Sequence, residues 1–283
     1  MTISSQPSAC LYVIATPIGN SDDLSIRACS ILDSVKFIVC EDTRQTKQLL
    51  FRQNIWKDQK LICGNEYRQE QIVPYISQLL DSGASIAYVT DAGTPGVSDP
   101  GPLCVGLIRG RGYPVVCVPG PSSITALLSV LSQYYAEWSF IGFFPRKDGQ
   151  RQELFASWLQ TGGVFIGLES PKRILELLAS AIMQYKGKSV HIHVAKELTK
   201  LHERLWEGPL ENVYESLLAN QDSIKGEFII CFSVTKDHKE YQWQKIAKIM
   251  VAQVGTKQTA KMIAECFDLK VSDVYQEIID KNE

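Results

Sequence analysis

Short apolar runs rich in valine, isoleucine, tyrosine and phenylalanine recur along this chain, and helical patterns separate them. The runs cover residues 10–15, 35–40, 85–89, 115–118, 140–143, 164–168, 190–194 and 228–232. Between them lie stretches with apolar residues at helical spacing, such as 71–80, 124–131 and 173–183. Strands that alternate with helices are typical of α/β proteins with largely parallel sheets. We therefore predict an α/β fold with parallel-rich sheets.

The chain length of 283 residues favours two domains over one. A division near residues 120–135 splits the predicted strands into two halves. We predict an N-terminal α/β domain over 1–121 and a C-terminal α/β domain over 122–235. Beyond Ser233 the strand signal ends and apolar residues recur at helical spacing. This pattern predicts a small helical appendage over 236–283 that resembles a helix-turn-helix pair.

Charge and composition exclude several classes of protein. The net charge of −2 provides no general attraction to a polyanion, so nucleic-acid binding would depend on local basic patches. No apolar stretch approaches the roughly 20 residues that span a bilayer, and residues 1–9 carry no Lys or Arg of an export signal. Eight cysteines without a C-x-x-C pair indicate buried thiols in a reducing compartment, not a metal site or a disulfide framework. We expect a cytoplasmic protein without a membrane segment.

Glycine, proline and charged residues gather directly after the predicted strands. These clusters cover residues 16–20, 41–46, 91–95, 119–123, 145–147, 169–173 and 196–200. In open α/β sheets the ligand crevice lies beyond the carboxyl ends of the strands, so we predict that the clusters converge on one site. The chain lacks G-x-G-x-x-G, G-x-x-x-x-G-K-[ST] and G-x-S-x-G. Dinucleotide binding, P-loop phosphoryl transfer and serine hydrolysis are therefore disfavoured.

Two of these loops suit a bound ligand. The segment from Thr90 to Gly101 reads TDAGTPGVSDPG, in which glycines permit close backbone approach and prolines stiffen the turn. Asp91 can accept hydrogen bonds from an amine or a ribose. The segment PGPSS places Ser122 and Ser123 at the start of a predicted helix, where free backbone N–H groups suit a carboxylate. A surface turn and an ordinary helix cap are the alternatives.

The order of the motifs carries more information than any one of them. The chain contains LYVIATPIGN (11–20), EDTRQT (41–46), TDAGTPGVSDPG (90–101), PGPSS (119–123), GFFPRK (142–147), ESPKR (169–173), AKELTKLHE (195–203) and KGE (225–227). In this order they resemble the ribosomal RNA small subunit methyltransferase I family, a branch of the tetrapyrrole methylase superfamily.

The resemblance implies two α/β domains with S-adenosylmethionine in the cleft between them, and a homodimer. It implies methylation of a ribose 2′-oxygen, that of cytidine 1402 in the 16S rRNA of the small ribosomal subunit. It also implies a set of residues near the methyl donor. These are Ile18, Gly19, Asp91, Gly93, Thr94, Ser98, Ser122 and Ser123.

Methyl transfer from a sulfonium is an in-line displacement, so alignment supplies most of the catalysis and no metal is required. A ribose hydroxyl is a poor nucleophile, and a nearby base would help it. Glu169, Lys196 and Glu197 lie at predicted strand ends and are the candidates. Ion pairs with Arg173 and Lys200 are the alternative roles of the two glutamates, so the base stays open.

A second group of side chains is predicted to bind RNA. Basic residues on one face can grip phosphates, and an aromatic ring can stack on an unstacked base. The basic candidates are Arg44, Arg146, Lys147, Lys172 and Arg173, with Lys47, Arg52, Arg68 and Arg151 as further members. Phe143 and Phe144 stand beside them, although core packing is the alternative. The helical appendage has no basic excess, and it either clamps rRNA or packs.

The chain departs from the family pattern at two places. Asn65–Arg68 replaces a His-Glu-His-Asn stretch, and Ser132 replaces a glycine that is expected to line the donor pocket. Two other functions compete with rRNA methylation. One is methylation of a tetrapyrrole or a protein by the same donor fold, and the other is a non-catalytic RNA-binding assembly factor.

Overall fold

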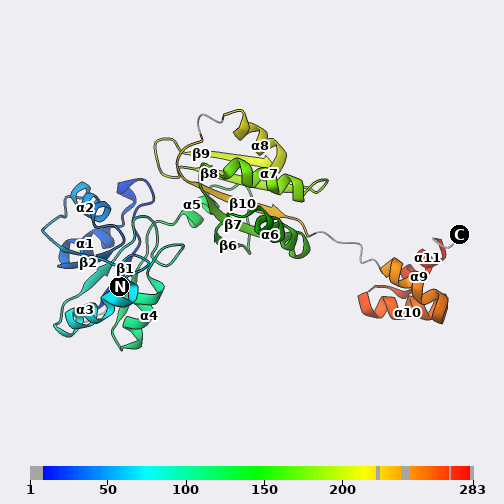
Figure 1. Cartoon of the computed structure of the whole chain (residues 1–283), viewed down its shortest axis with the longest axis horizontal. Coiled ribbons are helices and arrows are strands. Elements are labelled where there is room, and N and C mark those ends of the chain that lie inside the picture. The colour runs from blue at the N-terminus through cyan, green and yellow to red at the C-terminus, as the bar shows by residue number, and fades with distance from the viewer. Residues whose placement is uncertain (1–8, 221–223, 237–242, 268, 281–283) are drawn as a thin grey trace.

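The computed structural model describes residues 9–220, 224–236, 243–267 and 269–280. Figure 1 shows two α/β units, each built on one five-stranded sheet, and a group of three helices at the C-terminal end. Residues 1–8, most of the N-terminal segment in which no export signal is predicted, lie outside the described residues. Residues 237–242, near the start of the predicted appendage, lie outside them as well. Among the described residues no helix is both long and apolar enough to cross a membrane.

The first sheet is wholly parallel, with strand order β3-β2-β4-β1-β5. Its strands are β1 (Leu11–Ile14), β2 (Phe37–Cys40), β3 (Lys60–Cys63), β4 (Ile86–Tyr88) and β5 (Val115–Val118). The helices are α1 (Ile26–Ser34), α2 (Thr43–Arg52), α3 (Gln69–Asp81) and α4 (Pro102–Gly110), with the short 3-10 helix η1 (Ser21–Asp23) after β1.

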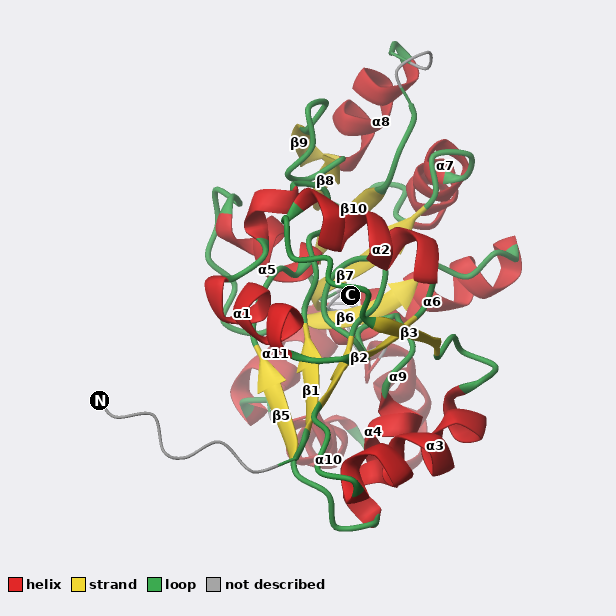
Figure 2. Cartoon of the chain, turned by 90° about the vertical axis from the view of Figure 1, so that its left-hand side faces the viewer, coloured by secondary structure: helices red, strands yellow, loops and turns green. Residues whose placement is uncertain are grey.

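Both faces of this sheet are covered by helices. Ile31 of α1 and Leu50 of α2 pack on one face, and Ile76 of α3 and Ile108 of α4 pack on the other. Strands buried on both faces read as continuous apolar runs, which is why four of the five were evident in the sequence. In Figure 2 the arrows of β1 and β5 point toward the second sheet, so the loops at their carboxyl ends face it.

The second sheet is mixed, with strand order β6-β7-β10-β8-β9. Its strands are β6 (Ser139–Phe143), β7 (Gly163–Glu169), β8 (Val190–Lys196), β9 (Arg204–Pro209) and β10 (Phe228–Val234). Its helices are α5 (Ser123–Ser129), α6 (Asp148–Thr161), α7 (Ile174–Gln184) and α8 (Leu210–Leu218). Helices α6, α7 and α8 cover one face, and α5 packs on the other through Ile124 and Leu127.

The prediction of a two-domain α/β fold is confirmed, with one difference in the second sheet. Only β6 and β7 pair in parallel there, whereas β10 runs antiparallel to both β7 and β8, and β9 antiparallel to β8. The parallel pairing expected for both sheets is therefore wrong for most of the second. The physical reason for this difference is β9, an edge strand of polar and apolar residues. It follows β8 without a crossover helix, so the chain reverses its direction there.

The C-terminal helices form a small unit with its own core. They are α9 (Trp243–Val254), α10 (Thr256–Phe267) and α11 (Val271–Asp280). Trp243 and Ala247 of α9 pack against Ile263 of α10 and Ile278 of α11. The predicted helical appendage is confirmed as three helices, and in Figure 1 it stands apart from the two sheets. The predicted boundaries at 121 and 235 stay predictions, while β5 ends at Val118 and β10 at Val234.

Candidate active site

A pocket of about 300 Å³ lies where the two sheets meet. Its walls come from strand ends and the loops that follow them in both units, from the start of α5, and from the turn that leads into β10 together with the first residues of that strand. The lining residues are Ile18, Ala92–Thr94, Val97–Asp99, Ser122, Ser123, Phe143, Leu168–Pro171, Ala195, Leu198 and Gly226–Ile229. Every sequence block named above except EDTRQT contributes to this wall. The structure thus brings together residues that are up to 211 positions apart, from Ile18 to Ile229.

Backbone hydrogen bonds tie the loops of the first unit together. Thr16 and Gly93 exchange two of them, at 2.9 and 3.0 Å, so the loops after β1 and β4 form an isolated antiparallel bridge. The Thr94 hydroxyl donates to the carbonyl of Pro121 at 3.1 Å and joins the loop after β5 to them. Gly93 has a φ of +79°, which favours glycine there. This scaffold holds the pocket wall in one conformation.

Further contacts join the first unit to the second. The backbone N–H of Asn20 donates to the Thr199 hydroxyl at 3.1 Å. A Cβ on Gly19 would lie 2.9 Å from the carbonyl oxygen of Leu198 and closer still to Lys200. Across the same opening, a Cβ on Gly142 would lie 3.4 Å from the Ser98 hydroxyl. The close approach explains why the motif carries glycine at position 19, whereas a φ of +71° favours glycine at position 142.

Six of the eight residues predicted near the methyl donor line the pocket. They are Ile18, Gly93, Thr94, Ser98, Ser122 and Ser123. Gly19 instead packs on the loop 198–200, and the carboxylate of Asp91 accepts a hydrogen bond from the backbone N–H of Asp42 at 3.1 Å. Gly19 and Asp91 therefore contact neighbouring loops and do not line the pocket.

The side chains at this wall include two polar groups that suit a ligand. Ser122 is the N-cap of α5, yet its hydroxyl caps no helical N–H and stays available to the pocket. Ser98 has a φ of +62°, a conformation that is uncommon for a residue other than glycine. Backbone strain of this kind clusters at ligand-binding sites.

An acidic group on the pocket wall was not singled out from the sequence. Burial raises the pKa of Asp99 to about 7, and the nearby carboxylates of Glu41, Asp91 and Glu227 add to the effect. Burial also raises the pKa of Glu41 and of Asp91 above their usual values. Carboxylates that crowd one another in this way are stabilised by a cation, so the wall is suited to a positively charged ligand. The sequence feature that could have indicated this acidic wall is the number of acidic residues in the loops that were predicted to converge.

Among the candidates for the base, Glu169 is the one on the pocket wall. Its side chain is fully buried at the end of β7. One oxygen, Oε1, accepts hydrogen bonds from the Arg173 guanidinium at 2.6 and 2.8 Å and from the backbone N–H of Ser170. The other, Oε2, is buried and has no hydrogen-bond partner among the described residues. A buried acceptor left unpaired costs free energy, so it calls for a donor from a ligand.

Glu197 and Lys196 lie beside the pocket and do not line it. The Glu197 carboxylate accepts from Lys200 Nζ at 2.9 Å and from the backbone N–H of Glu227 at 2.9 Å. Burial alone would raise the pKa of Glu197, but these two hydrogen bonds bring it below its usual value. Glu197 thus makes the ion pair that was its alternative role, and it fixes the Gly226–Glu227 turn of the pocket wall. Lys196 is buried at the end of β8.

The exposed basic residues among those predicted to bind RNA fall into two groups. Arg146, Lys147 and Lys172 are exposed beside the pocket loops. Arg44, Lys47, Arg52 and Arg68 are exposed on the first unit, where Arg44 pairs with Asp42 at 2.6 Å. Arg173 is largely covered and pairs with Glu169.

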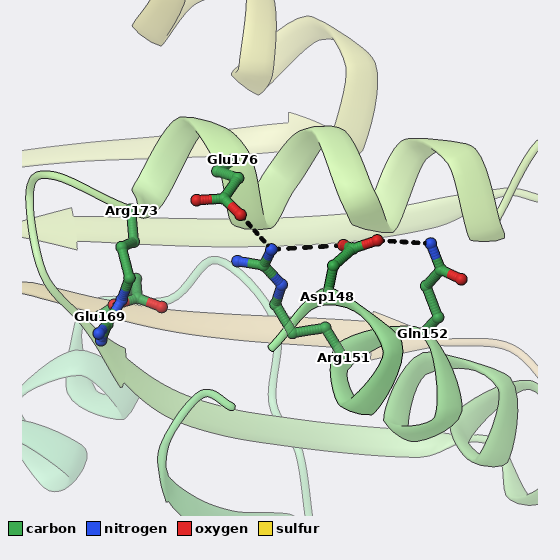
Figure 3. A network of polar contacts seen from close by, with 6 residues as sticks. All are labelled: Asp148, Arg151, Gln152, Glu169, Arg173 and Glu176. Atoms are coloured by element: carbon green, nitrogen blue, oxygen red, sulfur yellow. Dashed lines mark hydrogen bonds and ion pairs between the residues drawn. The ribbon is translucent and has the colours of Figure 1, made fainter. Parts of the chain in front are cut away.

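Arg151 does not belong to that surface. Its side chain is fully buried between α6 and α7, where it pairs with Glu176 and, at 3.3 Å, with Asp148 (Figure 3). The prediction that Arg151 grips phosphate is wrong because its guanidinium is held inside the protein by these two carboxylates. The sequence offered no sign of this burial, since its partner Glu176 lies 25 residues away.

The neighbouring phenylalanines have opposite roles. Phe143 is 59% exposed and lines the pocket, whereas Phe144 is buried in the core of the second unit. The predicted core role therefore holds for Phe144 alone. Ser132 does not line the pocket; its hydroxyl instead hydrogen-bonds to Glu207. In the segment that replaces the histidines, Tyr67 is 86% exposed.

Comparison with known proteins identifies relatives over most of the chain. A family model of tetrapyrrole (corrin/porphyrin) methylases matches residues 10–214. The ribosomal RNA small subunit methyltransferase I of Neisseria meningitidis serogroup B is 35% identical over 259 residues, which cover 90% of this chain and 88% of the relative. The Hydrogenobaculum protein of the same name is 37% identical over 235 residues, covering 82% and 98%. The Synechocystis protein is 32% identical over 272 residues, covering 94% and 96%.

Solved structures with the same fold are more distant in sequence. A cobalt precorrin-4 methyltransferase superposes with a TM-score of 0.56 at 14% identity, over 79% of this chain and 95% of that one. The uroporphyrin-III C-methyltransferase of Thermus thermophilus, in complex with S-adenosyl homocysteine, gives 0.54 at 14% identity, over 80% and 97%. At this identity the likeness establishes the fold alone.

Proposed function

The chain belongs to the ribosomal RNA small subunit methyltransferase I family of the tetrapyrrole methylases, and on that premise we propose that it methylates 16S rRNA with S-adenosylmethionine. The acceptor is the ribose 2′-oxygen of cytidine 1402 in the small ribosomal subunit. The observation that carries the proposal is the pocket between the sheets, whose wall includes Glu169, with one unpaired carboxylate oxygen, and loops that suit a cationic donor.

The donor is bound by charge and by backbone geometry. S-adenosylmethionine carries a sulfonium and an ammonium against a single carboxylate, so the acidic wall around Asp99 attracts it. The Ser122 and Ser123 hydroxyls line the same pocket and suit the donor carboxylate. Gly93 allows the donor to approach the backbone closely. The residues that support this wall, Gly19 and Asp91, act on the donor indirectly.

Glu169 is the base in this proposal. The ribose hydroxyl donates to Glu169 Oε2, the proton passes to that oxygen as the new O–C bond forms, and the sulfonium leaves as a neutral thioether. Arg173 holds the carboxylate in position through Oε1. Since displacement at a sulfonium needs no electrophile beyond the donor itself, the step is carried by alignment and by this one base.

The RNA lies across the opening of the pocket. The exposed ring of Phe143 stacks on the unpaired base of the target nucleotide, and Arg146, Lys147 and Lys172 neutralise the phosphates beside it. A homodimer acting in the cytoplasm on the small subunit, with the C-terminal helices clamping the RNA, completes the proposal.

Donor binding should depend on pH through Asp99. The carboxyl of Asp99 has a pKa of about 7, so it is neutral below that pH and ionised above it. A cationic donor binds the ionised form better, and we expect its affinity to fall about tenfold between pH 8 and pH 6. Isothermal titration of the wild type and of Asp99→Asn measures this. In the variant, donor affinity should change with pH only as far as the donor itself titrates. If donor affinity changed equally with pH in both proteins, a role of Asp99 in donor binding would be excluded.

Glu197 should act by holding the pocket wall. In the Glu197→Gln variant the ion pair with Lys200 is lost, and the turn at Gly226–Glu227 loosens. We expect turnover to fall more than about tenfold, because misplaced wall residues misalign the reactants. Donor affinity, measured by titration, should stay intact. Unchanged turnover would show that this turn contributes nothing to the reaction.

A single assay separates the competing acceptors. The protein is incubated with S-adenosylmethionine labelled in the methyl group and with isolated small subunits, free 16S rRNA, a uroporphyrinogen or total protein. Label in the rRNA supports the proposal. Label in the tetrapyrrole or the protein fraction, with none in rRNA, would overturn it.

A further inference from the structure

Two histidines and a glutamate meet on the outer strands of the second sheet. His191 and His193 alternate along β8 and so point to one face, and Glu207 of β9 is the cross-strand partner of His193. The Glu207 Oε1 atom lies 3.6 Å from His191 Nε2 and 3.5 Å from His193 Nε2. The ligand atoms of all three residues lie within 4.8 Å of one another.

The imidazole of His193 is unusually placed for a histidine without a ligand. Its side chain is fully buried, and neither ring nitrogen has a hydrogen-bond partner among the described residues. The ring of Tyr135 covers it edge-on at 6.2 Å between centroids. A histidine nitrogen that is buried without a partner is available to coordinate a metal ion.

The distances from the glutamate to the two histidines fit a small ion. Zinc binds histidine nitrogen and carboxylate oxygen at about 2.0–2.2 Å in tetrahedral geometry, which places the donor atoms about 3.3–3.5 Å apart. The separation from His193 lies within that range, and the separation from His191 lies about 0.1 Å beyond it. The Ser132 hydroxyl hydrogen-bonds to Glu207 and lowers the pKa of its carboxyl, as an outer-shell partner of a ligating carboxylate does.

We propose that His191, His193 and Glu207 form a binding site for a divalent transition-metal ion, with zinc the ion that best suits two imidazoles and a carboxylate. Such a ligand set favours zinc over calcium or magnesium, which take oxygen ligands. None of the three residues lines the pocket, and the methyl transfer proposed above does not involve the ion.

The ion has a structural role in this proposal. It joins β9, the edge strand, to β8, and through Ser132 and Tyr135 it also fixes the segment between α5 and β6. His193 lies two residues before Ala195, about 7 Å along the same face of β8, and Ala195 lines the pocket. The ion therefore braces one end of a strand whose other end shapes the pocket.

The site is tested by titrating the full chain, stripped of metal with a chelator, with Co²⁺ and then with Zn²⁺. We expect one Co²⁺ to bind per chain, to show the visible absorption of a four-coordinate nitrogen and oxygen site, and to be displaced by Zn²⁺. Zn²⁺ should also raise the melting temperature of the protein, because it binds the folded state.

Two variants at the site and one control make the assignment specific. His191 is only partly buried, so His191→Ala should fold, and Glu207→Gln keeps the shape of the side chain. Each should weaken Co²⁺ binding by at least about tenfold, since even outer-shell changes cost 10–100-fold. His202→Ala, at an exposed histidine away from the site, should bind as the wild type does. Absence of binding, equal affinity in the two site variants, or a sulfur-to-cobalt charge-transfer band from cysteine ligands would each overturn the proposal.

Discussion

Replacing Glu169 with glutamine should lower the rate of methyl transfer to small-subunit RNA by at least about 100-fold, the usual contribution of a positioned base. Glutamine fills the same buried volume and its amide oxygen can still accept from Arg173, so the pocket keeps its shape. The amide cannot take up the proton of the ribose hydroxyl. Donor affinity, measured by titration calorimetry, should therefore remain close to that of the wild type while single-turnover transfer is lost.

The matched control for this variant is Glu153→Gln. Glu153 is an exposed glutamate of α6 outside the pocket lining, and its replacement makes the same change of charge. Its turnover should equal that of the wild type. If Glu169→Gln kept more than about a third of wild-type turnover, a role of Glu169 as the base would be excluded.

Removing two charges beside the pocket should weaken RNA binding strongly. In Arg146→Gln with Lys147→Gln, two phosphate contacts are lost, and each contributes about 0.7 to 0.9 to the slope of affinity against salt. At about 0.1 M salt this predicts at least a roughly twenty-fold loss of affinity and a slope that is shallower by about 1.4 to 1.8. Filter binding of 16S rRNA at several salt concentrations measures both quantities.

A control of equal charge separates this local effect from the effect of net charge. Lys36 and Lys186 are exposed and precede β2 and β8, so they lie at the amino ends of the strands, opposite the pocket. The double variant Lys36→Gln with Lys186→Gln should bind RNA as the wild type does. Equal losses in the two double variants would mean that no patch at residues 146–147 exists.

Most of the fold was predictable because buried strands appear in the sequence as short apolar runs. Eight apolar runs correspond to eight strands, and each helical pattern lies between two of them. The two strands that were missed, β3 and β9, both lie at a sheet edge. β9 reads RLWEGP, in which only Leu205 and Trp206 are large and apolar, so its apolar signal is weak. Without β9 the sequence could not predict that most of the second sheet is antiparallel.

The candidate site was predictable in its position and less so in its chemistry. Loops that follow parallel strands must meet at one edge, so their convergence follows from the strand pattern. The raised pKa of Asp99 depends on burial and on acids of its own loop and of two other loops, which only the folded chain brings together. The burial of Arg151 depends in the same way on Glu176 of another helix. The histidine cluster was missed because its third member, Glu207, lies on the strand that escaped prediction.

The position of the methyl group tests the central proposal most directly. Small subunits from a strain that lacks the gene for this protein are incubated with the purified protein and S-adenosylmethionine, and the 16S rRNA is then digested and mapped by mass spectrometry. We predict one added methyl group, on the ribose 2′-oxygen of cytidine 1402, that is absent when the Glu169→Gln variant is used. A methyl group on a base, on a different nucleotide, or on no nucleotide at all would contradict the assignment of the pocket as a ribose methylation site.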